Sequence, residues 1–397
     1  MNERDWKAWG RAILIWPFDY TNHCGLNHWK NAKKCYTENK DASSFLCKIL
    51  EQGWQKADFG RESSIKNSYE LQRYYLNGLH PFLFPLWEGA DPLAFHRLFL
   101  RKNELYQLKY GDRTYSFRLE EIDLFFNGWG IGFVGFHIAI DQTDLASYLT
   151  CLEVMRQLET MYQGQELGKI VVNNNEFPLK EWFLSLIPSE VCHCFEMGKL
   201  KQYGYDDRMF IAHYASVEDQ GESTKQLKEE RDKLIFRFLN IDGTFLSSTN
   251  DIFRQHCIEE KVYQRWAPDT YFTIIEYAMG ILHFHPKGEE SFFAQTILPS
   301  QLNGVYYYLY LYLLQQRLTL ARLLHYCGEI SMERFEGAAR KELALNHLDY
   351  LRLFSTYQIT SQLQGLELWK QWRSELGIPD GEERLKRLFS TINLFPG

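Results

Sequence analysis

Two adjacent carboxylates are the residues of this sequence best suited to metal chemistry. Asp206 and Asp207 stand immediately before "RMFIAHYASV" (208–217), a run of residues typical of a strand. Two acids at a strand edge can hold a divalent cation, as they do in many magnesium-dependent hydrolases. Arg208 follows them directly, and an arginine-paired turn explains the same residues. Because no third acid stands at a recognisable spacing, we favour the turn.

Two histidines form a second candidate metal site. His283 and His285 in "LHFHP" are two residues apart, so in a strand both side chains point to the same face. Imidazole is a common metal ligand, although such pairs also arise by chance. A divalent cation is therefore the one cofactor that the sequence suggests.

The cysteine–histidine groups lack the spacing of a zinc site. "VCHCF" (191–195) places two cysteines around one histidine, which is tighter than the usual C-x₂₋₄-C pair, and no matching pair follows. The set His23, Cys24, His28 and Cys35 fits no standard zinc finger. We interpret these cysteines as buried or incidental thiols.

No other motif commits the protein to catalysis. The glycine run "GWGIGFVGF" (128–136) is followed by residues typical of a strand, whereas a dinucleotide loop requires a helix there. We expect a bent or bulged strand. Nucleophile, P-loop and zincin motifs are missing. The sequence favours a protein that is not an enzyme, and the alternative is a metal-dependent hydrolase or nuclease effector in stress or phage defence that uses Asp206 and Asp207.

Composition and charge restrict the partners and the location. The chain has 44 Lys+Arg against 51 Asp+Glu, and a net charge of -7 does not favour nucleic acid. Aromatic residues make up 16%, which indicates a folded chain with a large core. The first twenty residues show no secretory pattern, so we expect a cytoplasmic protein with reduced cysteines.

The stretch "YYYLYLYLLQQRLTLARLL" (306–324) predicts a buried helix. A membrane span needs about 20 mostly apolar residues, and here only nine precede Gln315, Gln316 and Arg317. We therefore expect no membrane span. The three polar residues must reach solvent, pair with buried acids or face a neighbouring subunit, which makes them candidate interaction residues.

The periodicity predicts an α/β or α+β fold, in which a mixed sheet with flanking helices precedes an all-helical region with a long stalk-like helix. We divide the chain into an irregular or helical region (1–100), a strand-rich domain (101–290) and a helical region (291–397). Helices are predicted over 41–54, 67–87, 144–162, 300–326 and 332–375, and again after "GIPDGEE" (377–383). The helix over 144–162 is expected to be capped by Asp141 or Thr143. Strands are predicted around a Gly111–Asp112 hairpin up to 140, and over 169–173, 208–217, 233–241 and 271–285.

Three pieces of the chain carry a family resemblance. Residues 106–140, 306–324 and 343–378, with the string "QLQGLELW" (362–369), make the chain similar to the cytoplasmic part of CorA-type divalent-cation channels. The resemblance implies a βαβ-rich domain, stalk helices and a tendency to form rings. It implies no channel, because the family's two transmembrane helices and their Gly-Met-Asn loop have no counterpart here.

The resemblance and the helix pattern together predict interaction surfaces. Gln362, Gln364, Glu367 and Trp369 belong to the resembling string. An apolar helix surface, which either joins subunits or packs within the chain, would consist of Leu345, Leu348, Leu351, Leu353, Leu363, Leu366 and Trp369. We therefore expect a soluble CorA-like protein that acts through oligomer assembly or ligand-controlled interaction, with a homo-oligomer or a protein partner.

Overall fold

The computed structural model describes most of the chain and all of the sheet and helices discussed below. The described residues are 6–20, 48–59, 68–85, 93–160, 163–196, 200, 208–219, 225–243, 250–288, 291–329, 338–355 and 358–393.

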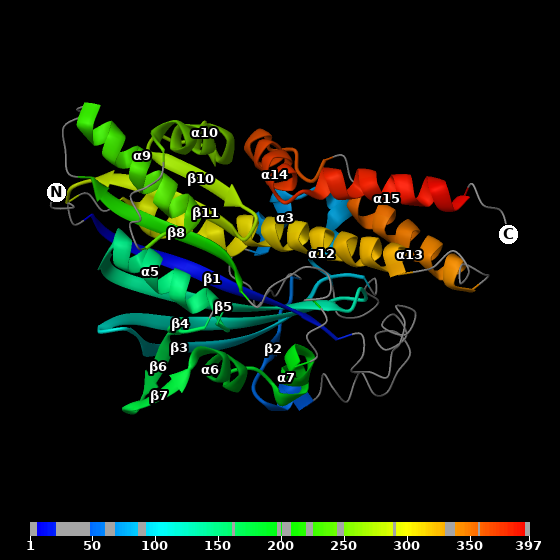
Figure 1. The fold of residues 1–397 in the computed structure, drawn as a ribbon, viewed down its shortest axis with the longest axis horizontal. Coiled ribbons are helices and arrows are strands. Elements are labelled where there is room, and N and C mark those ends of the chain that lie inside the picture. Colours follow the sequence, from blue (N-terminus) through cyan, green and yellow to red (C-terminus); the bar gives the residue numbers. More distant parts are fainter. Residues whose placement is uncertain are drawn as a thin grey trace.

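A mixed sheet organises these residues (Figure 1). Its eleven described strands are β1 (Lys7–Asp19), β2 (Gln55–Lys56), β3 (His96–Tyr110), β4 (Arg113–Phe126), β5 (Ile131–Asp144), β6 (Lys169–Val172), β7 (Asn175–Pro178), β8 (Phe210–Asp219), β9 (Val262–Tyr263), β10 (Thr270–Ile275) and β11 (Ala278–Pro286). The spatial order is β7-β6-β3-β4-β5-β1-β8-β11-β10-β9, and β2 pairs with β3. Strands β8 and β11 are parallel, whereas the other described pairs are antiparallel.

Helices cover both faces of the sheet and produce two hydrophobic cores. One core includes side chains of α5 (Leu145–Arg156), α6 (Leu179–Ser185), α7 (Ser189–Glu196), α9 (Lys225–Asn240) and α10 (Asp251–Lys261). The other includes side chains of α3 (Ser68–Tyr74), α4 (His80–Leu83), α12 (Tyr307–Glu329), α13 (Ala338–Phe354), α14 (Leu363–Glu375) and α15 (Ile378–Asn393). Along β1, odd-numbered Ile13 and Ile15 enter the α12-side core and even-numbered Ala12 and Leu14 enter the opposite one, because side chains alternate along a strand.

The predicted fold class is confirmed. The mixed sheet with flanking helices precedes a helical region in which α12 is the long helix (Figure 1). The hairpin of β3 and β4 turns at Gly111 and Asp112, and Gly111 has a φ of +56°, which suits a two-residue turn. The glycine run forms a turn through Gly130 and then β5, so no helix follows it.

Two secondary-structure predictions and one cap prediction in the first 290 residues are wrong, and one strand prediction is right except for a turn. Residues 7–19 form the central strand β1, not irregular structure or helix. The predicted strand 233–241 belongs to helix α9, whose apolar residues pack against β10 and β11 on one side only. The predicted strand 271–285 is the hairpin of β10 and β11. The helix after β5 is capped by Asp144, whose carboxylate accepts from Ser147 N at 2.8 Å, and not by Asp141 or Thr143.

The helical region also differs from prediction in its breaks. The helix predicted over 332–375 is two helices, α13 and α14, with non-helical residues between them. The break before α15 falls at Gly377, which has a φ of +66° and therefore ends a helix readily. Pro379 lies at the start of α15, where the missing N–H of proline is not needed.

Helix α12 is buried along the sheet, as its sequence predicts. Tyr307, Tyr308, Tyr310 and Tyr312 are all fully buried. Within the described residues, no helix combines the length and apolar character that a membrane crossing requires. Two π-helical segments, η2 (Phe293–Ile297) and η3 (Leu302–Tyr306), and the short helix α11 (Leu298–Gln301) lead into α12.

Candidate functional site

An open cleft of about 730 Å³ lies over the sheet where β1 begins and β5, β8 and β11 end. It is lined by Lys7, Ala8, Trp9, Arg11, Asp141, Thr143, Glu218, His285, Gly288 and Gln295. Strands β8 and β11 are the parallel pair, and ligands of open sheets commonly bind beyond the carboxyl ends of parallel strands.

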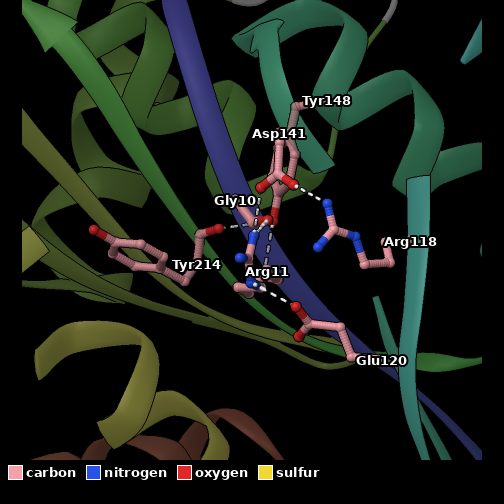
Figure 2. Close-up of polar contacts among 7 residues, drawn as sticks. All are labelled: Gly10, Arg11, Arg118, Glu120, Asp141, Tyr148 and Tyr214. Atoms are coloured by element: carbon pink, nitrogen blue, oxygen red, sulfur yellow. Dashed lines mark hydrogen bonds and ion pairs between the residues drawn. The ribbon is translucent and has the colours of Figure 1, made fainter. Parts of the chain in front are cut away.

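Arg11 is the best-anchored charged group of the cleft (Figure 2). Its Nη1 donates to Asp141 Oδ1 at 2.9 Å, and its Nε lies 3.3 Å from Glu120 Oε1. Arg118 Nη2 donates to the second Asp141 oxygen at 3.3 Å. Two guanidinium groups from β1 and β4 therefore converge on one carboxylate from β5.

Both carboxylates that hold Arg11 come from irregular points of the sheet. The register of β4 against β5 shifts between Leu119 and Glu121, which makes Glu120 an extra residue. The register of β1 against β5 shifts between Ala8 and Gly10, so Asp141 lies in a stretch where β5 has one more residue than β1. Bulges bend a strand and redirect side chains, and they are frequent beside functional sites.

The backbone beneath Arg11 is fixed from the opposite face of the sheet. The Tyr148 hydroxyl lies 2.9 Å from Tyr214 O and 3.1 Å from Arg11 O, and it donates toward both (Figure 2). The Tyr148 ring fits there because residue 10 is glycine: an added Cβ would lie 2.4 Å from Tyr148 Cε2. Gly10 therefore lets a buried hydroxyl support the strand that carries Arg11.

The remaining walls of the cleft are aromatic and charged. The Arg11 guanidinium carbon lies 5.7 Å from the centre of the Trp9 ring, within the range of a cation–π contact. Across the cleft, Glu218 Oε1 accepts from Gly288 N at 3.1 Å, and Glu218 pairs in register with His285. A second cavity of about 440 Å³, which includes Ser116, Ser147 and Cys151, shares Asp141 and Thr143 with the cleft.

A buried ion network lies farther along the same strands. Arg97 Nε donates to Asp123 Oδ1 and Arg97 Nη2 donates to Glu121 Oε1, both at 2.7 Å. His137 Nε2 lies 2.6 Å from the other Asp123 oxygen. Burial opposes charge on His137, but the Asp123 carboxylate raises the pKa of His137 above its usual value. Burial would likewise raise the pKa of Asp123, but Arg97 and His137 together lower it.

This network contains a group with the composition of a metal site. Within the part of the chain that the structure describes, Glu121, Asp123 and His137 are the one such group, and their ligand atoms all lie within 4.8 Å of one another. However, Arg97 already bonds to both carboxylates. A cation entering the group would have to displace a buried guanidinium, so we interpret the network as an internal ion-pair cluster.

Only two of the metal ligands predicted from sequence, His283 and His285, lie in the described residues. Asp206 and Asp207 lie outside them, so the hydrolase alternative stays a prediction. His285 lines the cleft, whereas His283 Nδ1 lies 2.9 Å from Thr270 Oγ1. Burial, followed by the charge of His285, lowers the pKa of His283. The N-terminal set 23–35 and the side chain of His193 also lie outside the described residues.

The polar residues in the middle of α12 have hydrogen-bond partners within the chain, although the buried Gln316 Oε1 has none among the described residues. Gln315 Oε1 accepts from Asn127 Nδ2 at 2.9 Å, and Gln316 Nε2 donates to Glu382 Oε1 at 3.0 Å. Arg317 lies at the helix edge, where its Nη1 donates to Glu276 O at 2.6 Å. Of the three outcomes open for these residues, pairing with an acid applies to Gln316 through Glu382, and partial exposure applies to Arg317. Gln315 is instead buried against the Asn127 amide, which none of the three outcomes anticipated.

The other predicted interaction residues have mixed environments. Trp369 is buried, Glu367 accepts from Tyr263 and Arg265, and Gln362 and Gln364 lie at or near the surface. The predicted apolar surface is divided, because Leu345, Leu348, Leu351 and Leu363 are exposed whereas Trp369 packs in the core. Assembly through this surface stays a prediction.

Sequence reasoning missed Arg11, Glu120 and Asp141 as a group. Arg11 and Asp141 are 130 residues apart, and no spacing rule connects them. No protein-family model, curated protein or solved structure matches the chain. The resemblance to CorA-type domains therefore remains a prediction.

Proposed function

We propose that this protein binds a small polar ligand in the cleft beside Arg11, and that ligand occupancy controls its interaction with other molecules. The observation that carries the proposal is the position of Arg11 in the cleft, where carboxylates from two irregular strand positions hold its guanidinium group. Exposed ion pairs contribute only about 0–1 kcal/mol to stability, so a gain in stability does not by itself explain the arrangement around Arg11. An anchored guanidinium is instead suited to recognition.

The acids of the cleft already have hydrogen-bond partners, which favours ligand binding over general-base catalysis by Asp141 or Glu218. Both Asp141 oxygens accept from arginine, and Glu218 accepts from a backbone N–H. A general base needs an oxygen or nitrogen that can reach the proton it removes. Around Arg11, the cleft presents N–H donors and the Trp9 ring to a ligand.

Helix α12 offers a route from the cleft to the helical region. Gln295 lines the cleft, and the neighbouring Ala294 O accepts from Tyr214 OH at 2.7 Å. The π-helical segments η2 and η3 continue into α12, on which Gln316 reaches Glu382 of α15. Because π-helical turns are frequent at functional sites, a ligand that repacks this segment would alter the position of α12.

A thermal-shift screen of small carboxylates, phosphate esters, amines and neutral polar compounds tests the proposal. At least one class should raise the melting temperature of the wild type, and Arg11→Gln should abolish that rise. Arg387→Gln is the matched control, because Arg387 is an exposed arginine paired with Glu383 on α15. No rise with any class, or a rise that survives Arg11→Gln, would contradict ligand binding in this cleft.

A further inference from the structure

We propose that the ligand is an organic carboxylate with an apolar body, and that its carboxylate replaces Asp141 between Arg11 and Arg118. This inference rests on the proposed function and specifies the ligand class. Its starting point is that the structure already contains a carboxylate bound by these two arginines, Asp141 itself.

The unused hydrogen-bonding groups around Asp141 are mostly donors. Among the described residues, Arg11 Nη2 and the Nε and Nη1 groups of Arg118 have no recorded hydrogen-bond acceptor. Lys7, which lines the cleft, has no recorded ion-pair partner in the described residues. A ligand that complements surplus donors must supply acceptor oxygens, and a carboxylate fits the planar fork of arginine.

The Asp141 side chain can turn away from the two arginines into solvent. Its side chain is 45% exposed and lies where the two cavities meet. Glu120, whose side chain is 31% exposed, continues to hold Arg11 when Asp141 turns to solvent. Because exposed ion pairs contribute little to stability, exchanging one carboxylate for another changes the free energy of the protein little. The selectivity must then come from the rest of the ligand.

The rest of the ligand meets an apolar wall. Trp9 and Ala8 line the cleft beside Arg11, and the Trp9 ring is held edge-on against Tyr214 at 5.3 Å. A flat apolar group placed against Trp9 would be removed from water, which stabilises the complex. Acetate lacks this group, whereas benzoate has both the carboxylate and the ring.

Calorimetric titration with benzoate, benzamide, acetate and inorganic phosphate tests the ligand class. Benzoate should bind the wild type at least about tenfold more tightly than benzamide or acetate, a difference of about 1.4 kcal/mol. Phosphate should bind more weakly than benzoate, because it lacks the ring. The inference is overturned if benzamide, acetate or phosphate binds with the same affinity as benzoate.

Asp141→Asn tests the exchange itself. Removing the competing carboxylate should tighten benzoate binding by about fivefold, since the pair it breaks is a weak exposed one. Asp251→Asn, which removes an exposed acid paired with Arg254 on α10, should leave benzoate affinity unchanged. Unchanged or weaker binding in folded Asp141→Asn would overturn the exchange. If only amines or neutral compounds bind in the cleft, this inference is wrong but the proposed function still holds. If no compound binds in a way that requires Arg11, both are wrong.

Discussion

Arg11 Nη1 lies 2.9 Å from Asp141 Oδ1, although the two residues are 130 positions apart. The contact exists because β1 runs beside β5 and because the pairing of these strands is irregular at Asp141. The same arginine is approached from its other side by Glu120, an extra residue of β4. Two local departures from regular pairing therefore create the charged centre of the cleft.

Gly10→Ala is expected to destabilise the fold by about 1–3 kcal/mol. The added methyl group would lie 2.4 Å from Tyr148 Cε2 and 2.5 Å from Tyr214 O, and the latter is backbone that cannot move without disturbing β8. Urea denaturation measures the loss. Gly78→Ala is the control, because nothing lies within 4 Å of a Cβ there. Equal stability of the two variants would show that the Tyr148 ring tolerates a side chain at position 10.

Arg97→Met is expected to lower the free energy of unfolding by about 3–5 kcal/mol, because it leaves the Asp123 carboxylate buried without its main cationic partner. Arg387→Met removes an exposed pair on α15 and should cost less than about 1 kcal/mol. Denaturant unfolding compares the two. A loss below 1 kcal/mol for Arg97→Met would mean that the cluster is hydrated and not an internal ion-pair network.

Wild-type protein should gain no thermal stability from Mg²⁺, Mn²⁺ or Zn²⁺ through Glu121, Asp123 and His137, because Arg97 already occupies the carboxylates. The measurement is the melting temperature with each metal and with a chelator. A ligand that binds only the folded state raises that temperature. A metal-dependent rise of several degrees that disappears in Asp123→Asn would contradict this interpretation.

His137 should stabilise the fold more in acid than in alkali. The Asp123 carboxylate raises the pKa of His137 above the ordinary value of about 6.5, so the folded state binds the proton more tightly. The stabilisation is full below about pH 6.5 and is lost as the pH rises through the folded-state pKa. The stability of His137→Gln relative to wild type should therefore be lowest in acid and recover with rising pH. A difference that does not change between pH 5.5 and 8.5 would contradict the pairing.

His213 should have the opposite effect. Burial lowers the pKa of His213 to about 3, and neither ring nitrogen has a hydrogen-bond partner among the described residues. The unfolded chain takes up a proton below about pH 6.5 whereas the folded chain does not, so stability falls as the pH drops from 6.5 toward 3. His213→Phe keeps the stacking on Phe238, and it should reduce the loss of stability between pH 6.5 and 3. The exposed control His256→Gln should leave it unchanged.

Much of the architecture could be predicted from local patterns. The turn at Gly111 and Asp112 was recognisable because two residues between β-rich runs have few alternatives. Strand β1 was missed because a central strand buried on both faces lacks the alternation that marks a half-buried one. Helix α9 was mistaken for a strand because Leu234, Ile235 and Phe236 form a short apolar run, and such runs do not distinguish the two structures.

The candidate site could not be predicted for a different reason. Arg11 is a single charge in an apolar segment, and Glu120 and Asp141 are two acids among 51 Asp+Glu residues. Their significance depends on strand register and on two irregular pairings, which the sequence does not encode in any short motif. The residues selected instead, Gln315 and Gln316, were conspicuous as polar groups in an apolar helix, and their partners Asn127 and Glu382 lie within the chain.

The measurement that tests the central claim most directly is a calorimetric titration of wild type and Arg11→Gln with the compound that most stabilises the wild type. Arg11 carries the charge that both Asp141 and Glu120 hold in the cleft. Its loss should therefore weaken binding at least about tenfold, or about 1.4 kcal/mol, while far-ultraviolet circular dichroism stays unchanged. Equal affinity of folded Arg11→Gln and wild type would contradict the claim that this cleft is the binding site.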